Sequence, residues 1–431
     1  MIVRVPVVTL HHHLIAQIIG SLSDVFTRGA HADKSIEHAF KSHPKWGARD
    51  RKLFAESVYD IVRWWRWHWH LAGLPDAECM QKEAITEDRL WRVWAAYWIT
   101  KGEEPAPFAE CRAVSKASVH EQQIRKIPAA VQASIPDWLY ERCAREIGTG
   151  WPEMLEALNK PAPVDLRVNT LKIATRDLQA ALSKEDVEAG PVRGQPEAIR
   201  LRMRRNVFAT QAFKAGLFEL QDAASQRVAP FLEVAPGMRV VDACAGAGGK
   251  TLHIAALMKN KGRIIALDIH EWKLAELRRR ARRNGVGIIE PRLIEGAKTI
   301  KRLAITADRV LLDVPCSGLG VLRRNPDTKW KLSPEELERL HVIQHDILRS
   351  HSRMVKPGGK LVYATCSILP SENEEQVSAF LREHGDEWKL EAELKLRPGE
   401  NDGDGFYAAR LIRLPKVKPS TANEALESDV E

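Results

Sequence analysis

The stretch that decides the fold is Asp242-Ala243-Cys244-Ala245-Gly246-Ala247-Gly248-Gly249-Lys250-Thr251, a glycine-rich turn. It lies between an apolar run at 238–243 and a helix-forming segment at 250–259. Small residues at a strand-to-helix turn let backbone amides approach a ligand closely, and the start of a helix favours negative charge. The turn therefore predicts a cofactor loop at the carboxyl end of a strand in a parallel sheet.

Three kinds of nucleotide loop compete for this turn. A loop of the Walker type needs glycine where Cys244 stands, and a dinucleotide fingerprint starting at Gly246 needs glycine where Thr251 stands. An adenosine cofactor without a pyrophosphate remains, and S-adenosylmethionine fits. Asp268 ends the next predicted strand and suits the ribose hydroxyls. The alternative for a lone aspartate at a strand end is a cap on the helix that follows.

Strands and helices alternate from about residue 216 onward. Strands are predicted at 238–243, 263–269, 288–294, 307–313 and 360–365, and helices at 250–259, 271–284, 334–355 and 372–384. Capping boxes starting at Ser333 and Ser371 begin the last two helices, and Pro357-Gly358-Gly359 turns the chain into the last strand. Repeated strand–helix units of this kind predict an α/β, Rossmann-like sheet covered on both faces.

The rest of the chain divides into regions of different character. Residues 1–125 are predicted to be all-helical, and the tryptophans concentrated there are assigned to a helix-bundle core rather than to base stacking. Residues 126–215 predict a small α+β module, and 216–415 form the cofactor-binding domain. The polar tail 416–431 is predicted to be disordered. The module carries an arginine cluster for which RNA contact and a solvated face stay equally open: Arg200, Arg202, Arg204 and Arg205.

Composition narrows the class of protein. The chain has 431 residues, 44% hydrophobic and 28% charged, and a formal net charge of +8, which fits a polyanionic partner. Its six cysteines are too sparse for a disulfide framework, which indicates a reducing compartment, the cytoplasm. None of them forms a Cys-x-x-Cys pair, so no zinc ribbon is predicted. No metal site is predicted, because consecutive His11, His12 and His13 cannot share a helix face. No apolar stretch reaches the length of about 18 residues that a membrane span needs.

Two cysteines stand at the ends of predicted strands. One lies in Leu312-Asp313-Val314-Pro315-Cys316-Ser317-Gly318 and the other in Tyr363-Ala364-Thr365-Cys366-Ser367. Both strand ends face the crevice where a parallel sheet binds ligands. A thiolate that adds to carbon 6 of a cytosine makes carbon 5 nucleophilic toward a sulfonium methyl group, and a second thiol beside it would assist release. Asp313 is placed to hold the ring's N3 and its amine.

The motifs together resemble the Nop/Sun family of RNA cytosine-C5 methyltransferases. The matching residues are Gln221-Asp222-Ala223-Ala224-Ser225, the 244–251 loop, Asp313-Val314-Pro315-Cys316-Ser317-Gly318, Arg323-Arg324-Asn325-Pro326-Asp327, Thr365-Cys366-Ser367 with Glu372-Asn373-Glu374, and Gly405-Phe406-Tyr407. The resemblance implies that Cys366 is the nucleophile and that Cys316 helps to release the product. It also implies a cofactor site lined by Cys244, Ala245, Gly246, Ala247, Gly248, Gly249, Lys250, Asp268, Glu295 and Asp313.

The sequence departs from the family at two points of that site. Gly246 and Ala247 replace the common Ala-Pro of the loop, which loosens the turn but leaves its amides available. Glu295 stands where the family often has aspartate. The helical start is similar to the NusB-like RNA-binding domain of bacterial RsmB-type rRNA methyltransferases. A charged face exposed to solvent is favoured for the basic helix 273–283, and RNA contact near the target base for Arg323 and Arg324.

The sequence thus predicts an S-adenosylmethionine-dependent enzyme that methylates carbon 5 of a cytosine in RNA. The predicted substrate is rRNA, with tRNA as the alternative, and the base must be single-stranded or flipped out. Two alternatives remain at this point. One is a non-catalytic RNA-binding or ribosome-assembly factor with a vestigial methyltransferase fold, and the other is a nicotinamide oxidoreductase on the same sheet.

Overall fold

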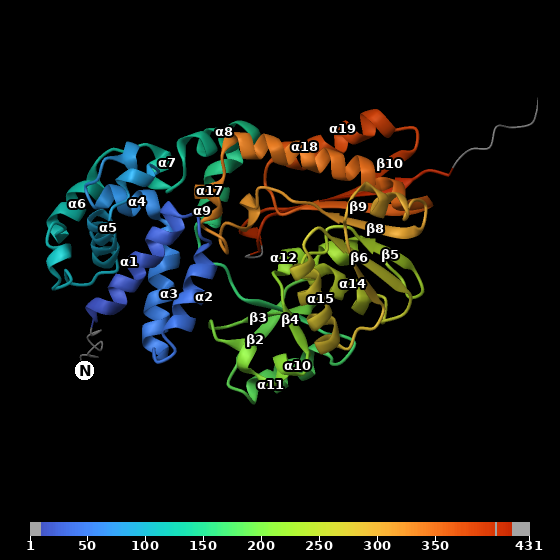
Figure 1. Cartoon of the computed structure of the whole chain (residues 1–431), viewed down its shortest axis with the longest axis horizontal. Helices are drawn as coiled ribbons and strands as arrows, with labels where there is room; N and C mark the ends of the chain where they lie inside the picture. The colour runs from blue at the N-terminus through green and yellow to red at the C-terminus, as the bar shows by residue number, and fades with distance from the viewer. Residues whose placement is uncertain (1–9, 401–402, 416–431) are drawn as a thin grey trace, which may run out of the picture. The chain divides into compact units, whose positions relative to one another are not determined.

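The computed structural model describes residues 10–400 and 403–415, which fall into two compact units (Figure 1). The helical unit contains the described residues up to Ala162 together with Ser317–Glu338, and the sheet unit contains Pro163–Cys316 and the described residues from Arg339 onward. The boundaries expected near residues 125 and 215 do not coincide with this division. The tail expected to be disordered, 416–431, lies outside the described residues.

The helical unit is built on amphipathic helices that bury one tryptophan-rich core. Trp65, Trp69, Trp91 and Trp94 are fully buried, in agreement with their helical spacing. Trp64 separates the third of these helices from the fourth. The helices are α1 (His12–Thr27), α2 (Ala32–Ser42), α3 (Ala48–Arg63), α4 (Trp65–Leu71), α5 (Glu87–Thr100), α6 (Lys116–Ile124), α7 (Ala129–Gln132), α8 (Asp137–Ile147) and α9 (Trp151–Leu158).

The segment Ser317–Glu338 joins this unit through buried polar anchors. It contains α17 (Thr328–Lys331) and the start of α18 (Pro334–His351). The Lys329 ammonium donates to the carbonyl of Arg63 at 2.8 Å, and the Trp330 indole donates to the carbonyl of Val62 at 2.7 Å. Arg323 is buried and donates to the carbonyl of Pro161 at 2.9 Å. The expectation that Arg323 contacts RNA is therefore wrong, because its guanidinium is used inside the unit.

A small antiparallel sheet opens the sheet unit. Its strands are β1 (Asp165–Val168), β2 (Ala189–Val192), β3 (Gln195–Leu201) and β4 (Phe218–Leu220), in the order β2-β3-β1-β4. Helices α10 (Thr175–Ser183) and α11 (Gln211–Lys214) pack against it. We call residues 163–220 the small module. Arg200 pairs with the buried Asp165 at 2.6 Å, whereas Arg202, Arg204 and Arg205 lie exposed. Whether these three exposed arginines contact RNA or form a solvated face stays open.

The large sheet of this unit has seven strands. Its order is β10-β11-β9-β8-β5-β6-β7, and β5 to β9 run parallel while β10 and β11 are antiparallel. The strand order reverses beside β5, which is the switch point where such sheets bind ligands. The strands are β5 (Arg239–Asp242), β6 (Arg263–Asp268), β7 (Ile289–Leu293), β8 (Ala307–Asp313), β9 (Val355–Thr365), β10 (Trp388–Leu396) and β11 (Phe406–Arg413).

Alternate residues of the strands enter two different cores. On β6, Ile265 and Leu267 join a cluster with α18 and α19 (Glu374–His384), whereas Ala266 joins a cluster with α14 (Gly249–Leu257) and α15 (Glu271–Asn284). Because successive side chains of a strand point to opposite faces, the two clusters show that both faces are covered. The expected α/β, Rossmann-like class is confirmed.

Three local expectations differ from the structure. The long helix ends at His351 rather than near 355, and residues 356–359 form a bulge inside β9 instead of a turn before it. Helix α19 begins at Glu374 after a short 3-10 turn, so Ser371 does not cap it. The pair β10 and β11 was not expected at all. No helix among the described residues is both long and apolar enough to cross a membrane.

Candidate active site

The glycine-rich turn joins β5 to α14, as expected, and it leaves open space beside its backbone. A Cβ added at Gly246 or Gly249 would meet no heavy atom within 4 Å. Gly248 has a φ of 86°, and a Cβ there would overlap Leu277 of α15. This glycine is therefore required by both backbone conformation and packing. The loop has the shape of a cradle in which a ligand can approach the main chain.

Asp268 ends β6 beside this cradle. One carboxylate oxygen accepts from the backbone N–H of Gly246 at 2.9 Å, and the other accepts from the N–H of His270 at 2.9 Å. Each oxygen keeps a second lone pair that could accept a ribose hydroxyl. The side chain thus ties the loop to the neighbouring strand and fits an adenosine ligand at the same place.

Lys250 and Asp313 form an ion pair between the loop and the end of β8. The ammonium lies 2.6 Å from the carboxylate. Burial alone would lower the pKa of Lys250, but the attraction of Asp313 raises it above its usual range. Behind the pair, burial raises the pKa of Asp242 to about 7, although Thr251 donates to this carboxylate at 2.6 Å. Charge at the loop is therefore concentrated on the Lys250–Asp313 pair.

The two strand-end cysteines meet. The Sγ atoms of Cys316 and Cys366 are 3.4 Å apart, and both side chains are partly exposed. They follow β8 and β9, which are adjacent and parallel, so their carboxyl ends lie at one edge of the sheet. At Cys244, in the glycine-rich loop, burial raises the pKa of the thiol above its usual range. Its thiol stays protonated at neutral pH and is unsuited to nucleophilic attack.

Side chains from α18 and the turn after β9 fix the two thiol-bearing loops. Gln344 of α18 donates both to the carbonyl of Pro315, at 3.0 Å, and to the buried carboxylate of Glu372, at 2.9 Å. Tyr363 donates to the carbonyl of Glu372 at 2.7 Å, and Thr365 donates to Asn373 at 2.5 Å. One glutamine therefore holds the loop before Cys316 to the turn after Cys366.

Glu295 is the outlying member of the expected set. It is exposed and follows β7, two strands away from β5 in the sheet order. Its assignment to the cofactor site stays a prediction. Among residues 10–400 and 403–415, no group of three or more His, Cys, Asp or Glu side chains could hold a metal ion.

Comparison with known proteins agrees with this arrangement. The family model described as 16S rRNA methyltransferase RsmB/F matches residues 229–412, and a model of the ferredoxin-like domain of such methyltransferases matches 135–208. A probable ribosomal RNA small subunit methyltransferase B of Synechocystis is 32% identical over 90% of this chain and 97% of its own length. The chain belongs to the RsmB/F family of 16S rRNA methyltransferases.

One further relative and two solved structures show how far the similarity extends along the chain. A probable ribosomal RNA small subunit methyltransferase B of Bacillus subtilis is 36% identical over 68% of this chain and 68% of its own length. The crystal structure of PH0851 covers 92% of this chain and 98% of its own, with a TM-score of 0.74 and 25% identity. The structure titled NSun6 from Pyrococcus horikoshii with SFG shares the fold, at a TM-score of 0.60 and 22% identity over 65% of this chain and 98% of its own.

As a member of the RsmB/F family, the chain is an RNA methyltransferase that uses S-adenosylmethionine. The residues at the edge of the sheet fit that cofactor: the open glycine cradle leaves room for a main-chain contact, and the Asp268 carboxylate lies directly beside the loop, bonded to the N–H of Gly246. The resemblance drawn from the motifs is thus confirmed.

Sequence reasoning missed the residues that hold the site in place. Gln344 could have been found as a polar residue on a helix face that is otherwise buried. The contacts of Arg167 and Arg280 with the loop gave no comparable signal, because the acceptors of these two bonds are backbone carbonyls of a distant segment.

Proposed function

We propose that the protein transfers a methyl group to carbon 5 of a cytosine in small-subunit rRNA, with Cys366 as the covalent nucleophile. The observation that carries the proposal is the 3.4 Å separation of the Cys316 and Cys366 sulfurs beside the Lys250–Asp313 pair. Two thiols in contact at the ligand-binding edge of a methyltransferase sheet suit a reaction that must first form and then break a carbon–sulfur bond.

The chemistry follows from the order of addition and elimination. The Cys366 thiolate adds to carbon 6 of the ring, and the electron pair of the C5=C6 double bond then makes carbon 5 nucleophilic. S-adenosylmethionine, when bound, supplies the electrophilic methyl group. Cys316 takes the proton from carbon 5, the double bond re-forms, and the Cys366 thiolate leaves. Two thiolates in contact would repel, so Cys316 keeps its proton while Cys366 is a free thiolate. Cys316 gives that proton to solvent once the Cys366 sulfur is bonded to carbon 6, and can then accept the proton from carbon 5.

Asp313 has the electrostatic role in this scheme. Its carboxyl group, at the end of β8, holds N3 and the exocyclic amine of the cytosine, and must be protonated while it donates to N3. Lys250, at 2.6 Å, draws the carboxylate toward the cofactor loop. The pair therefore places the carboxyl group that holds the cytosine next to the cofactor.

The substrate rests on the relatives, two of which are named small-subunit rRNA methyltransferases. The net charge of +8 suits a polyanion. We propose the cytoplasm as the site of action, because the catalytic thiols need a reducing compartment. A tRNA substrate is the alternative, which mapping of methylated positions would reveal.

Two cysteine variants test the proposal with purified protein, rRNA and labelled cofactor. Cys366→Ala should lose 5-methylcytosine formation by on the order of 10⁴-fold, as expected when a nucleophile is removed. Cys316→Ala should retain a covalent protein–RNA complex, seen as a slower band on a denaturing gel. Cys143→Ala, in α8 of the helical unit, is the control and should behave as the wild type. An active Cys366→Ala enzyme, or no 5-methylcytosine with either rRNA or tRNA, would contradict the proposal.

A further inference from the structure

The cofactor loop is tied through its backbone N–H groups, to Asp268 at Gly246 and to Ala245 at Gly248, but it has no side chain of its own to hold its carbonyls. Residues 245–249 are all alanine or glycine, so none carries a side chain that could bind the loop's carbonyls. Ala247 also lacks the ring that would fix φ in a proline. An unrestrained loop loses conformational entropy when a ligand orders it, and the affinity falls accordingly. Whatever restrains the loop from outside therefore contributes to cofactor binding.

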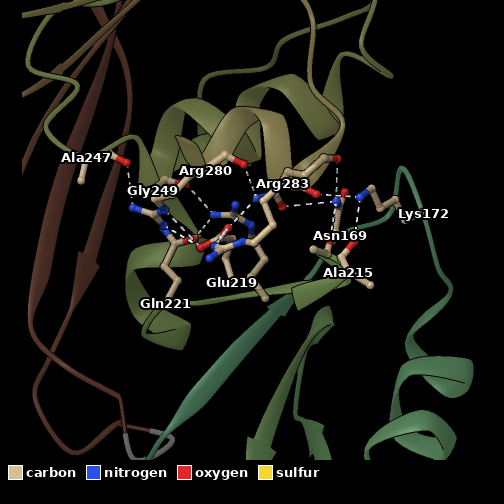
Figure 2. A network of polar contacts seen from close by, with 12 residues as sticks. Asn169, Lys172, Ala215, Glu219, Gln221, Ala247, Gly249, Arg280 and Arg283 are labelled. Carbon is tan, nitrogen blue, oxygen red and sulfur yellow. Dashed lines mark hydrogen bonds and ion pairs between the residues drawn. The ribbon is translucent and has the colours of Figure 1, made fainter. Parts of the chain in front are cut away.

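Two arginines from other elements supply this restraint. Arg280 of α15 donates from Nη1 to the carbonyl of Ala247 at 2.7 Å (Figure 2). Arg167 of β1 donates from Nη1 to the carbonyl of Gly249 at 2.6 Å and also contacts Gln221. The bonds lie on either side of Gly248, whose backbone is left-handed. The peptide planes before and after the turn are thus both fixed.

A buried carboxylate orients the arginine on α15. Glu219 of β4 accepts from Nη2 of Arg280 at 2.8 Å, and it also accepts from Arg283 and Asn284 (Figure 2). Burial would raise the pKa of Glu219, but the attraction of Arg280 and the bonds from Arg283 and Asn284 lower it below its usual value. Glu219 therefore stays ionised and keeps the guanidinium of Arg280 aimed at the loop.

The small module is joined to the end of α15 by further bonds. Asn169 donates to the carbonyl of Asn284 at 3.0 Å, and Lys172 donates to the carbonyl of Arg283 at 2.7 Å (Figure 2). Gly216 allows this close approach, because a Cβ there would overlap the Arg283 carbonyl. The arginines are thus held by a rigid frame rather than by flexible surface contacts.

We propose that Arg167 and Arg280 are positioning residues for S-adenosylmethionine, and that the small module is in this way part of the cofactor site. Both act through the loop's carbonyls and neither needs to touch the cofactor. Burial lowers the pKa of Arg167 to about 10, so the guanidinium remains charged at neutral pH. The proposal does not depend on which nucleotide is methylated.

The basic helix thereby has two sides with different roles. The side chain of Arg280 is 16% exposed and is committed to Glu219 and the loop, whereas that of Arg279 is 70% exposed and pairs with Glu276. The expectation of a charged face exposed to solvent over 273–283 is therefore wrong for Arg280 and Arg283. Arg279 gives a matched control on the same helix.

Calorimetric titration with S-adenosylmethionine measures cofactor affinity directly, and steady-state kinetics supply the KM for RNA as the second constant. Arg280→Ala should weaken cofactor binding about 10-fold, the equivalent of one charge-assisted hydrogen bond, while the KM for RNA stays unchanged. Arg279→Ala should leave both constants unchanged. Arg280→Lys keeps the charge facing Glu219 but loses the fork that reaches both partners, so it should fold normally and weaken binding a few-fold.

Two results would overturn the proposal. If folded Arg280→Lys and Arg280→Ala bind the cofactor like the wild type, the arginine only stabilises the fold. If they instead raise the KM for RNA, and do so with a reduced dependence on salt, Arg280 is a phosphate contact. Should Arg280→Ala not fold, Arg280→Lys and Arg167→Lys carry the test alone, with the same two outcomes.

Discussion

The ligand-binding edge of the large sheet has two halves that are held in different ways. The loop half, at the ends of β5 and β6, consists of small residues whose carbonyls are bound by Arg167 and Arg280 from elsewhere in the chain. The thiol half, at the ends of β8 and β9, carries Cys316 and Cys366 and is held by Gln344 and by the turn that follows β9.

This difference indicates a division of labour. The loop half binds through main-chain groups, so its restraints should govern cofactor affinity more than the rate of the chemical step. The thiol half places reacting atoms, and small displacements there should lower kcat with little effect on cofactor binding. The Lys250–Asp313 pair is where the halves meet. Substitutions in each half can therefore separate affinity from rate.

The largest effect that tests this division is expected at Asp313. Asp313→Asn keeps the shape of the side chain but removes its proton transfer and its charge. We expect kcat to fall by on the order of 10²–10⁴, the usual contribution of a positioned acid or base. Cofactor affinity should fall far less, because the loop's other restraints remain. Single-turnover methylation and calorimetric binding would give the two numbers.

Asp308→Asn is the control for Asp313→Asn, since Asp308 lies on the same strand near its other end. Asp308 accepts from the backbone N–H of Arg239 at 2.8 Å and pairs with Lys356 at 2.7 Å, away from the thiols. It should change stability slightly and leave kcat unchanged. If both variants lose the same activity, or if Asp313→Asn acts mainly on affinity, the two halves are not functionally distinct.

Much of the thiol half could be predicted from sequence. Strand β8 has the bounds expected, because its run of apolar residues dominates the local structure. Parallel strands bring their carboxyl ends to one edge, so two cysteines at strand ends were expected to meet, and the sulfurs are 3.4 Å apart. Their catalytic roles remain a proposal that the experiments above decide.

The loop half was predictable in position but not in its supports. Arg167 lies 82 residues from Gly249, and a backbone carbonyl leaves no mark on the sequence as an acceptor. Lys329 shows the same limit in the helical unit, where a lysine is buried and donates to the carbonyl of Arg63. Charged residues are assigned to the surface by default. The placement of 317–338 in the helical unit was missed for this reason.

A smaller effect, confined to rate, is expected at Gln344. Gln344→Leu removes the bonds to Pro315 and Glu372 while keeping the buried volume similar. We expect kcat to fall about 10-fold, because the loss of roughly one hydrogen bond's energy loosens the spacing of the thiols. Cofactor affinity should not change. Steady-state kinetics with RNA and cofactor varied in turn would show this split.

Asp346→Ala, on the same helix, gives the comparison for Gln344. The Asp346 carboxylate is exposed and lies 3.4 Å from Arg349, so its removal should cost little. A Gln344→Leu enzyme with normal kcat would show that the strands alone set the thiol spacing. A rise in the cofactor KM would instead place Gln344 in the loop half.

The smallest effect is a pH dependence of stability in the loop half. Burial raises the pKa of Asp242 to about 7, above its ordinary 3.8. A carboxyl group whose pKa is raised on folding contributes stability that is fully present below about pH 4 and is lost as the pH rises through 7. Asp242→Asn keeps an acceptor for Thr251 but cannot ionise. Its Tm should fall less than that of the wild type between pH 4.5 and 7, by about 2–4 °C.

The difference between the two proteins isolates Asp242, because buried histidines titrate in both. His253 of α14, for example, has a pKa that burial lowers to about 4, and its contribution cancels in the comparison. The same scans with Gln344→Leu should show the wild-type dependence, because Gln344 belongs to the thiol half. Parallel melting curves for wild type and Asp242→Asn would mean that Asp242 is already ionised when folded. In that case the Lys250 ammonium would have to balance two carboxylates, those of Asp242 and Asp313.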